Sequence, residues 1–304
     1  MVIRFPDFEY DEDANHYNNS VENSAQFIKL QRDLKHIIFR ESHYSKAIGT
    51  ALKVVRSSLR HVEFIETVFD KYCRLDWLPY CSQLETLTFI DSEMLIEEIL
   101  IPLRFSPLTQ LRSLIFNEDP VPIDTLEALI SNNINLQEIA FGWPSDCNQY
   151  GNSKILTSIS KFCPNLTKLG ATFGGSEICD LILILDNCKH LQYLEIYGNG
   201  YLLVADEIMP KLGKSLPSAF GELVIGAQWR FNADYLVRFF ENSNHIPLYR
   251  FVIKICDFIN EEHLSVIVRN SQSSLKFFTF MDKTFLVAKE GMKEASKWLR
   301  QNLF

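Results

Sequence analysis

The sequence has 304 residues, of which 47% are hydrophobic, and its formal net charge is -8 with a pI near 5.4. This acidic balance argues against a surface for nucleic acid or for an anionic membrane, because both need clustered Lys and Arg. The longest apolar run, residues 181–185, is far shorter than the roughly 20 residues that a membrane helix requires. We therefore expect neither nucleic acid nor a membrane among its partners.

Residues 1–26 are acidic and polar, and their few aromatic side chains are too isolated to build a core. We expect this segment to be flexible or to form a loose cap. It contains no apolar stretch of the kind that a secretory signal needs. The seven cysteines are scattered along the chain without a CxxC pair, which fits free thiols in a reducing compartment. We expect an intracellular protein, in the cytoplasm or the nucleus.

Residues 27–283 are dominated by a repeat of the form L-x-x-L-x-L, in which Ile, Val, Phe or Ala replaces some of the leucines. Ten copies occur, and the starts of successive copies are 25 to 30 residues apart. This spacing matches that of leucine-rich repeats. The copies begin at Leu34, Leu59, Leu84, Leu111, Leu136, Leu166, Leu191, Phe220, Leu248 and Leu275.

Each copy is expected to form a short strand followed by a helix. Along the strand, the fourth and sixth positions face the core, and the third, fifth and seventh face outward. The segments that follow have apolar residues at helical spacing, as around Leu126, Ile155, Leu181, Leu236 and Leu264. One repeat cannot bury its inner face alone, so neighbours must stack. The pattern predicts an α/β fold, a leucine-rich-repeat solenoid with a curved parallel sheet on the concave side and helices on the convex side.

The position eight residues after each opening Leu is mostly polar, which suggests a ladder of side chains that pairs with buried backbone groups. Pro144, Gly174 and Lys283 depart from it, so we expect irregularity near the fifth and sixth strands. The ladder residues are Ser42, Thr67, Ser92, Asp119, Asn199, Gln228 and Cys256.

Three cysteines, Cys81, Cys163 and Cys188, each lie three residues before an opening Leu, and Cys256 lies on the polar ladder. The ninth copy, which runs from Leu248 through Cys256 to Leu264, resembles the cysteine-containing repeat class that is typical of F-box proteins with leucine-rich repeats. The Phe-rich style is similar to the large F-box families of fungi.

This resemblance implies a substrate receptor of an SCF-type ubiquitin ligase, which acts in ubiquitin-dependent protein degradation. The partners would be a protein substrate on the concave face, and the SCF adaptor and cullin if an F-box lies outside this chain. Residues 1–26 are too short and too polar for the three helices of an F-box. The alternative is therefore a stand-alone leucine-rich-repeat scaffold or inhibitor that is not linked to ubiquitin.

No pattern in the sequence indicates catalysis. The histidines are dispersed without an H-E-x-x-H arrangement, and neither G-x-x-x-x-G-K-[ST] nor G-x-G-x-x-G occurs. A nucleophilic cysteine would need a base held beside it, and the repeat-locked spacing of these cysteines fits core packing better. We expect no enzyme, no catalytic residue, no cofactor and no metal.

Candidate protein-binding residues are those at the outward strand positions, where Tyr and Arg are favoured at interfaces. Phe277 and Met281 share such positions, and Trp143 and Trp229 either rim the same surface or cover an edge. The candidates are Tyr193, Glu195, Tyr197, Arg250, Lys254, Glu138 and Lys168.

Residues 284–304 are expected to form a capping helix that seals the end of the stack. Ala288, Met292, Ala295 and Leu299 fall on one face of this helix. The alternative is an amphipathic helix that binds a partner.

Overall fold

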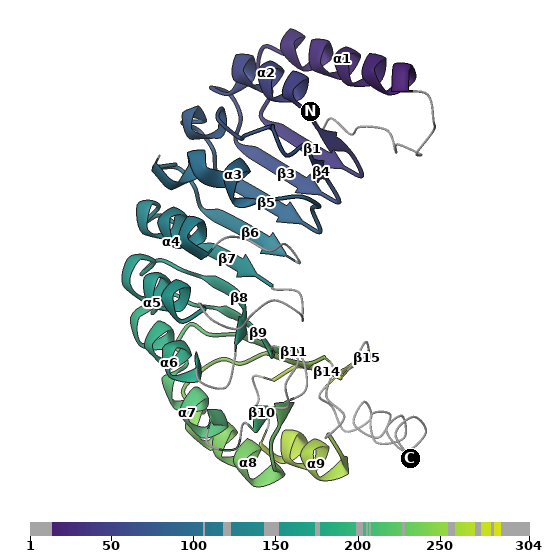
Figure 1. Cartoon of the computed structure of the whole chain (residues 1–304). Helices are drawn as coiled ribbons and strands as arrows, with labels where there is room; N and C mark the ends of the chain where they lie inside the picture. Colours follow the sequence, from purple (N-terminus) through teal and green to yellow (C-terminus); the bar gives the residue numbers. More distant parts are fainter. Residues whose placement is uncertain are drawn as a thin grey trace. The chain divides into compact units, whose positions relative to one another are not determined.

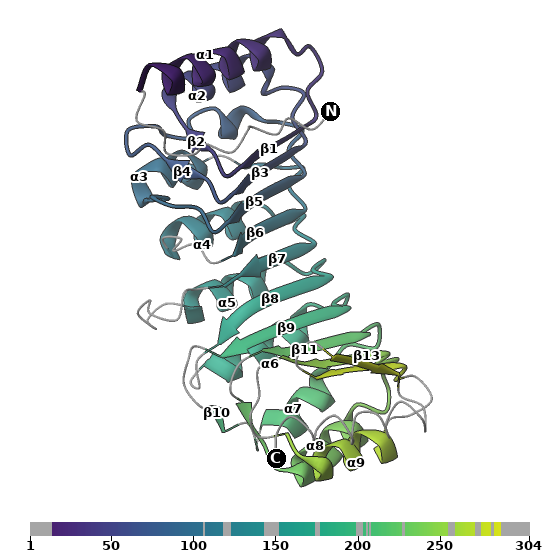
Figure 2. The same ribbon diagram turned by 90° about the vertical axis from the view of Figure 1, so that its right-hand side faces the viewer.

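A computed structural model describes residues 14–105, 107–117, 123–142, 152–173, 177–198, 203–204, 206, 208–226, 229–254, 259–270, 275–280 and 283–286. The chain divides into two compact units, residues 1–163 and residues 164–304. Both are built from parallel strands that alternate along the chain with helical segments (Figures 1 and 2).

The described residues of the first unit form five parallel strands that hydrogen-bond in chain order. Their register is set by the repeat, since Ile37 pairs with Val62, Val62 with Leu87, and Leu87 with Leu114. A short parallel pair, β2 (His43–Tyr44) and β4 (Val68–Phe69), follows the first two strands. The five strands are β1 (His36–Arg40), β3 (His61–Ile65), β5 (Thr86–Ile90), β6 (Ser113–Asn117) and β7 (Glu138–Phe141).

The helical segments of the first unit differ in length. Four are helices of ten or more residues, whereas the segments after β3 and β5 contain only short helical turns. The long ones are α1 (Ala14–Leu30), α2 (Lys46–Val55), α4 (Ile123–Asn132) and α5 (Asn152–Phe162). The short ones are η1 (Leu78–Tyr80), α3 (Glu97–Leu100) and η2 (Ile101–Phe105).

Helix α1 corrects the expectation that residues 1–26 are flexible, since residues 14–26 are helical. Val21, Ala25 and Ile28 are buried at helical spacing, and α1 packs against α2. The sequence prediction missed this stripe because it weighed the acidic composition of the whole segment. Residues 1–13 lie outside the described residues.

Where the second unit is described, it has five further parallel strands and one antiparallel strand, β15 (Lys283–Leu286), which pairs with the last of them. A second short parallel pair is formed by β10 (Leu203–Val204) and β12 (Trp229–Arg230). The parallel strands are β8 (Lys168–Phe173), β9 (Tyr193–Gly198), β11 (Glu222–Gly226), β13 (Arg250–Ile253) and β14 (Phe277–Phe280). The helices are α6 (Ile178–Asn187), α7 (Ile208–Ser215), α8 (Ala233–Asn242) and α9 (Glu261–Asn270).

Strand β15 corrects part of the expectation for residues 284–304. Residues 284–286 extend along β14, where Phe285 pairs with Phe278, so the expected capping helix does not begin at residue 284. The rest of that prediction, residues 287–304, lies outside the described residues.

The fold class is confirmed as an α/β leucine-rich-repeat solenoid. Each of the ten parallel strands carries the fourth and sixth positions of one repeat, and wherever those side chains are described they are buried. The helices expected around Leu126, Ile155, Leu181, Leu236 and Leu264 are present as α4, α5, α6, α8 and α9.

Sixth-position phenylalanines form a stacked column in the first unit. The ring centroids of Phe39 and Phe64 are 5.0 Å apart, those of Phe64 and Phe89 are 5.1 Å apart, and those of Phe89 and Phe116 are 4.8 Å apart. The interplanar angles are 9°, 12° and 11°. Each of these phenylalanines therefore stacks on the one in the neighbouring repeat.

The polar ladder forms hydrogen bonds at two of the three positions whose side chains are described, and the buried Ser42 hydroxyl has no partner among the described residues. Thr67 Oγ1 donates to the carbonyl of Phe39 at 3.2 Å, and Ser92 Oγ donates to that of Phe64 at 3.5 Å, each reaching the preceding strand. Asp119, Asn199, Gln228 and Cys256 lie outside the described residues, as do Pro144 and Gly174, and Lys283 is described only as part of β15.

Candidate binding surface

Three neighbouring strands of the second unit bring the predicted site residues together. Strand β9 presents Tyr193, Glu195 and Tyr197 at its outward positions, all partly exposed. Register places Glu222 of β11 beside Tyr193, and Arg250 of β13 beside Glu222.

Glu195 is the centre of a hydrogen-bonded group, which we name the Glu195 network: Tyr193, Glu195, Tyr197 and Lys254. The Tyr193 hydroxyl donates to Glu195 Oε2 at 2.7 Å, and the Tyr197 hydroxyl donates to Oε1. Lys254 Nζ donates to Oε1 at 2.5 Å and to the Tyr197 oxygen at 2.7 Å. The carboxylate therefore accepts three hydrogen bonds, one of them from a charged donor. Hydrogen bonds to an ionised group are stronger than those between neutral groups.

Gly226 is the reason why these side chains can meet. It pairs in register with Tyr197, and the backbone N–H of Lys254 donates to the carbonyl of the preceding Ile225 at 2.8 Å. A Cβ atom built on Gly226 would lie 2.4 Å from the Cδ1 and Cε1 atoms of Tyr197. The Tyr197 ring thus occupies space that any other residue at 226 would fill, and Lys254 reaches across the intervening strand.

The pKa values of the network follow from its hydrogen bonds. Burial by itself would raise the pKa of Glu195, but the donors from Lys254, Tyr197 and Tyr193 outweigh burial and hold that pKa below its usual range. Burial raises the pKa of Tyr193, and donation to Glu195 raises it further. Burial would lower the pKa of Lys254, yet its bonds to Glu195 and Tyr197 raise it overall. At neutral pH Glu195 and Lys254 therefore form a charged pair, and the hydroxyls of Tyr193 and Tyr197 beside it are neutral.

A second group adjoins the network along the same strands, and we name it the Arg250 pair. Arg250 Nη1 lies 2.9 Å from Glu222 Oε1, and the Tyr249 hydroxyl donates to Glu222 Oε2 at 3.4 Å. Arg250 remains 41% exposed. Phe277, which is in register with Arg250 on β14, is 37% exposed. The Arg250 cation and the Phe277 ring therefore face outward side by side.

The remaining predicted residues come from two further strands. Lys168 is exposed on β8 and pairs in register with Tyr193, so it borders the Glu195 network. Glu138 belongs to β7 in the first unit, where it accepts a hydrogen bond of 2.9 Å from the Ser113 hydroxyl. Trp143 and Met281 lie outside the described residues, and for Trp229 only the backbone of β12 is described.

The prediction omitted Glu222 and Gly226, although both are outward positions of the eighth copy by the same alternation that found Tyr193 and Arg250. It also omitted two outward hydrogen bonds of the first unit. His36 Nε2 lies 2.7 Å from Glu63 Oε1, and His61 Nδ1 lies 3.1 Å from Thr86 Oγ1. Applying the alternation to every copy places all of these residues on the outward face, but it does not show their contacts.

Cys81, Cys163 and Cys188 are fully buried, as their spacing predicts. Burial raises the pKa of the Cys81 thiol to about 12 and that of Cys188 to about 11. Both stay protonated at neutral pH and are poor nucleophiles, because the thiolate is the reactive form. Among the described residues, no three His, Cys, Asp or Glu side chains gather as they would around a metal ion. Within the same residues, no helix combines the length and apolarity needed to cross a membrane.

Comparison with known proteins finds likeness among solved structures. No protein-family model matches the chain, and no curated protein matches it. Among solved structures, the leucine-rich repeat-containing protein LegL7 from Legionella pneumophila is similar over 99% of this chain and 98% of its own, with 9% identity and a TM-score of 0.48. The fold assignment therefore rests on the strands, helices and repeats of this chain itself.

Proposed function

We propose that the chain is a non-enzymatic protein-recognition module, and that the Glu195 network and the Arg250 pair form its binding surface. The observation that carries the proposal is the clustering of two tyrosines, one arginine and a phenylalanine on adjacent outward strand positions. Tyr and Arg dominate the binding energy of many interfaces. Tyr193 and Tyr197 are already held by Glu195, so little side-chain entropy is lost when a partner binds.

The surface is tested by comparing proteins captured by the full chain and by its variants. Arg250→Glu reverses the exposed charge, and Tyr193→Ala removes one ring. Lys211→Glu, on α7 of the same unit, is the matched control because it reverses an exposed charge on a helix. A direct partner should be lost with both surface variants and retained with the control. Retention by both surface variants would overturn this assignment.

We propose further that the recognised partner is a substrate delivered to an SCF-type ubiquitin ligase. The resemblance of the ninth copy to the cysteine-containing repeat class supports this role. It requires an F-box outside this chain to bind the adaptor. Cullin and adaptor should co-purify with the full gene product, and the captured partner should persist longer in cells that carry the Arg250→Glu variant. Failure to recover cullin and adaptor would count against the ubiquitin link but not against the binding surface.

The second candidate is a scaffold or inhibitor with no link to ubiquitin. It needs no adaptor-binding module, and the helix described before β1, α1, packs against α2 as part of the repeat stack. A partner that depends on Arg250 for capture, but whose lifetime does not change with the variant or with proteasome inhibition, would select this candidate.

A further inference from the structure

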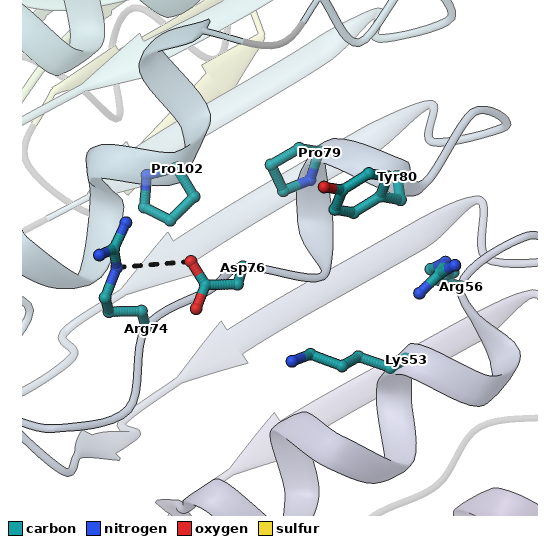
Figure 3. Close-up of a pocket in the computed structure, with 7 residues that line it drawn as sticks. All are labelled: Lys53, Arg56, Arg74, Asp76, Pro79, Tyr80 and Pro102. Carbon is teal, nitrogen blue, oxygen red and sulfur yellow. Dashed lines mark ion pairs between the residues drawn. The ribbon is translucent and has the colours of Figure 1, made fainter.

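The helical side of the first unit contains a hollow of about 640 Å³, separate from the outward strand positions. Figure 3 shows its lining, which we name the basic hollow: Lys53, Arg56, Arg74, Asp76, Pro79, Tyr80 and Pro102. Lys53 comes from α2 and Arg56 follows it, Pro79 and Tyr80 come from η1, and Pro102 comes from η2.

The hollow exists because the helical layer is thin at this point. Helix α2 has 10 residues, but η1 has only 3, and the next helical stretch is broken into α3 of 4 residues and η2 of 5. Pro79 lies at the start of η1 and Pro102 lies near the start of η2. At the start of a helical turn the missing N–H of proline costs little, but proline prevents a preceding helix from continuing through it. Leu78 and Leu103 still anchor these turns in the core. The short turns leave the side of α2 open.

The lining is basic although the chain as a whole is acidic. Three cations and one carboxylate line the hollow, a net charge of +2 in a chain of net charge -8. Arg74 Nε lies 3.4 Å from Asp76 Oδ1, the one ion pair drawn in Figure 3. The Arg56 guanidinium lies over the Tyr80 ring at 5.1 Å. In the part of the chain that the structure describes, neither Lys53 nor Arg56 is paired with a carboxylate.

The position of Lys53 and Arg56 at the end of α2 has an ordinary explanation, since cations there favour the helix dipole. That explanation does not cover Arg74, which comes from the segment before η1 and faces the same space. The helix dipole also does not explain why Pro79, Tyr80 and Pro102 line the hollow. Figure 3 shows Arg74 at one end of the hollow, beside Asp76, and Arg56 at the other, so cations from two segments line it and an anionic occupant would complement their charge.

We propose that the basic hollow binds a phosphorylated serine or threonine side chain of a protein partner. A phosphoryl group carries a charge of about -1.5 to -2 at neutral pH, which matches the lining. Arginine supplies the paired donors that phosphate oxygens accept, and lysine adds a point charge.

Several features favour a peptide over a small molecule or a membrane. A small ligand usually buries most of its surface, whereas Lys53, Arg74, Asp76 and Tyr80 are all exposed. Tyr80, which lines the hollow, is 65% exposed, and two further apolar side chains on the helical segments that line it are exposed, Val54 by 61% and Phe105 by 79%. The Tyr80 ring can cover a residue that flanks a phosphorylated side chain. The net charge of -8 disfavours an anionic membrane.

The test uses the full chain and an array of short peptides with varied flanks, each synthesised with serine, phosphoserine or glutamate at its centre. The variant Lys53→Glu/Arg56→Glu should weaken binding of the phosphoserine peptides by about tenfold or more, the loss expected for two charged donors. Asp76→Asn removes the competing carboxylate and should strengthen their binding by a few fold. A gain of binding cannot arise from misfolding.

The second unit offers a matched control hollow of about 490 Å³, lined by Lys189, Lys211, Lys214 and Asp186. It has the same formal charge but neither arginine nor aromatic ring in its lining. Lys211→Glu/Lys214→Glu should leave phosphopeptide binding unchanged.

Three outcomes would overturn the proposal. The first is equal binding of the serine, glutamate and phosphoserine peptides. The second is an equal loss in the control variant, which would reduce the effect to overall charge. The third is binding of phosphatidylserine vesicles, but not peptides, with the same sensitivity to Lys53 and Arg56, which would identify a membrane surface instead.

Discussion

The two units build the same repeat with different side chains at equivalent positions. In the first unit the sixth position holds the stacked column of Phe39, Phe64, Phe89 and Phe116. In the second unit the sixth positions are small or aliphatic in four copies, with Ala171, Ile196, Ile225 and Ile253, and the tenth copy has Phe280. Aromatic side chains of this unit pack at other positions. The ring centroid of Phe251, at a fourth position, lies 6.0 Å from that of Phe239 on α8.

The outward faces also differ. The first unit presents short polar side chains and two histidines, linked pairwise as in His36 with Glu63. The second unit presents the Glu195 network and the Arg250 pair. The repeat therefore fixes which positions face inward or outward, but not how apolar volume and charge are divided among them. That division determines where a partner can bind.

The largest expected effect comes from the aromatic column. Phe64 is fully buried and its ring packs against Phe39, Tyr44, Phe69 and Phe89. Phe64→Ala should lower the free energy of unfolding by about 3–5 kcal/mol, because it leaves a cavity inside the column. Urea unfolding measures the change. Phe105→Ala, at a side chain that is 79% exposed, is the control and should have little effect. A loss below about 1 kcal/mol for Phe64→Ala would show that the column can collapse around the gap.

The Glu195 network should give the next largest effect. Glu195→Ala leaves Lys254 and two tyrosine hydroxyls without their acceptor and should cost about 2 kcal/mol. The cost should depend on pH. Because the pKa of Glu195 is lowered on folding, its stabilising effect is present above the pKa of the unfolded state and is lost as the pH falls through the folded pKa.

Urea unfolding of the wild type and of Glu195→Gln at several pH values tests this dependence. The difference in stability should be full at neutral pH and should shrink in the acidic range, as the carboxylate becomes protonated. A difference that is constant across this range would mean that Glu195 contributes by packing rather than by charge.

These two effects differ in how far the sequence predicts them. The repeat alone identifies Phe64 as inward and Glu195 as outward, because alternation needs only the register of each strand. It also places Lys254 on the outward face, but Lys254 lies 59 residues from Glu195 along the chain. Their contact depends on Gly226, whose missing side chain makes room for Tyr197. No periodicity shows that a glycine on the intervening strand is a spacer.

The basic hollow was likewise not predicted, for a different physical reason. Repeat spacing sets where each strand begins, but it does not set how much of the segment between strands is helical. Pro79 and Pro102 keep two of these segments short, and only packing shows that the space beside α2 stays open. Helix α1 was missed because its buried stripe of Val21, Ala25 and Ile28 follows directly on an acidic segment.

Gly226→Ala should have a smaller effect on stability than on binding. The new Cβ would overlap Tyr197, so the ring must move off the strand and its bonds to Glu195 and Lys254 must break. We expect a loss of about 1–2 kcal/mol in unfolding free energy, as for a mild overpacking. Capture of the partner should fall as far as with Tyr193→Ala. Unchanged capture would show that the partner does not need the Glu195 network to be ordered.

The smallest expected effect is a difference in stability between two substitutions in the polar ladder, at Thr67 and at its first member, Ser42. Thr67 is fully buried and its hydroxyl donates to Phe39 of the preceding strand, so Thr67→Val should cost about 1 kcal/mol for the lost hydrogen bond. Ser42 occupies the same position one repeat earlier, after β1, and its buried Oγ has no hydrogen-bond partner among the described residues. Ser42→Ala should therefore be neutral within about 0.5 kcal/mol. Equal costs at both positions, measured by urea unfolding, would mean that the ladder stabilises through its small size rather than through bonds to the preceding strand.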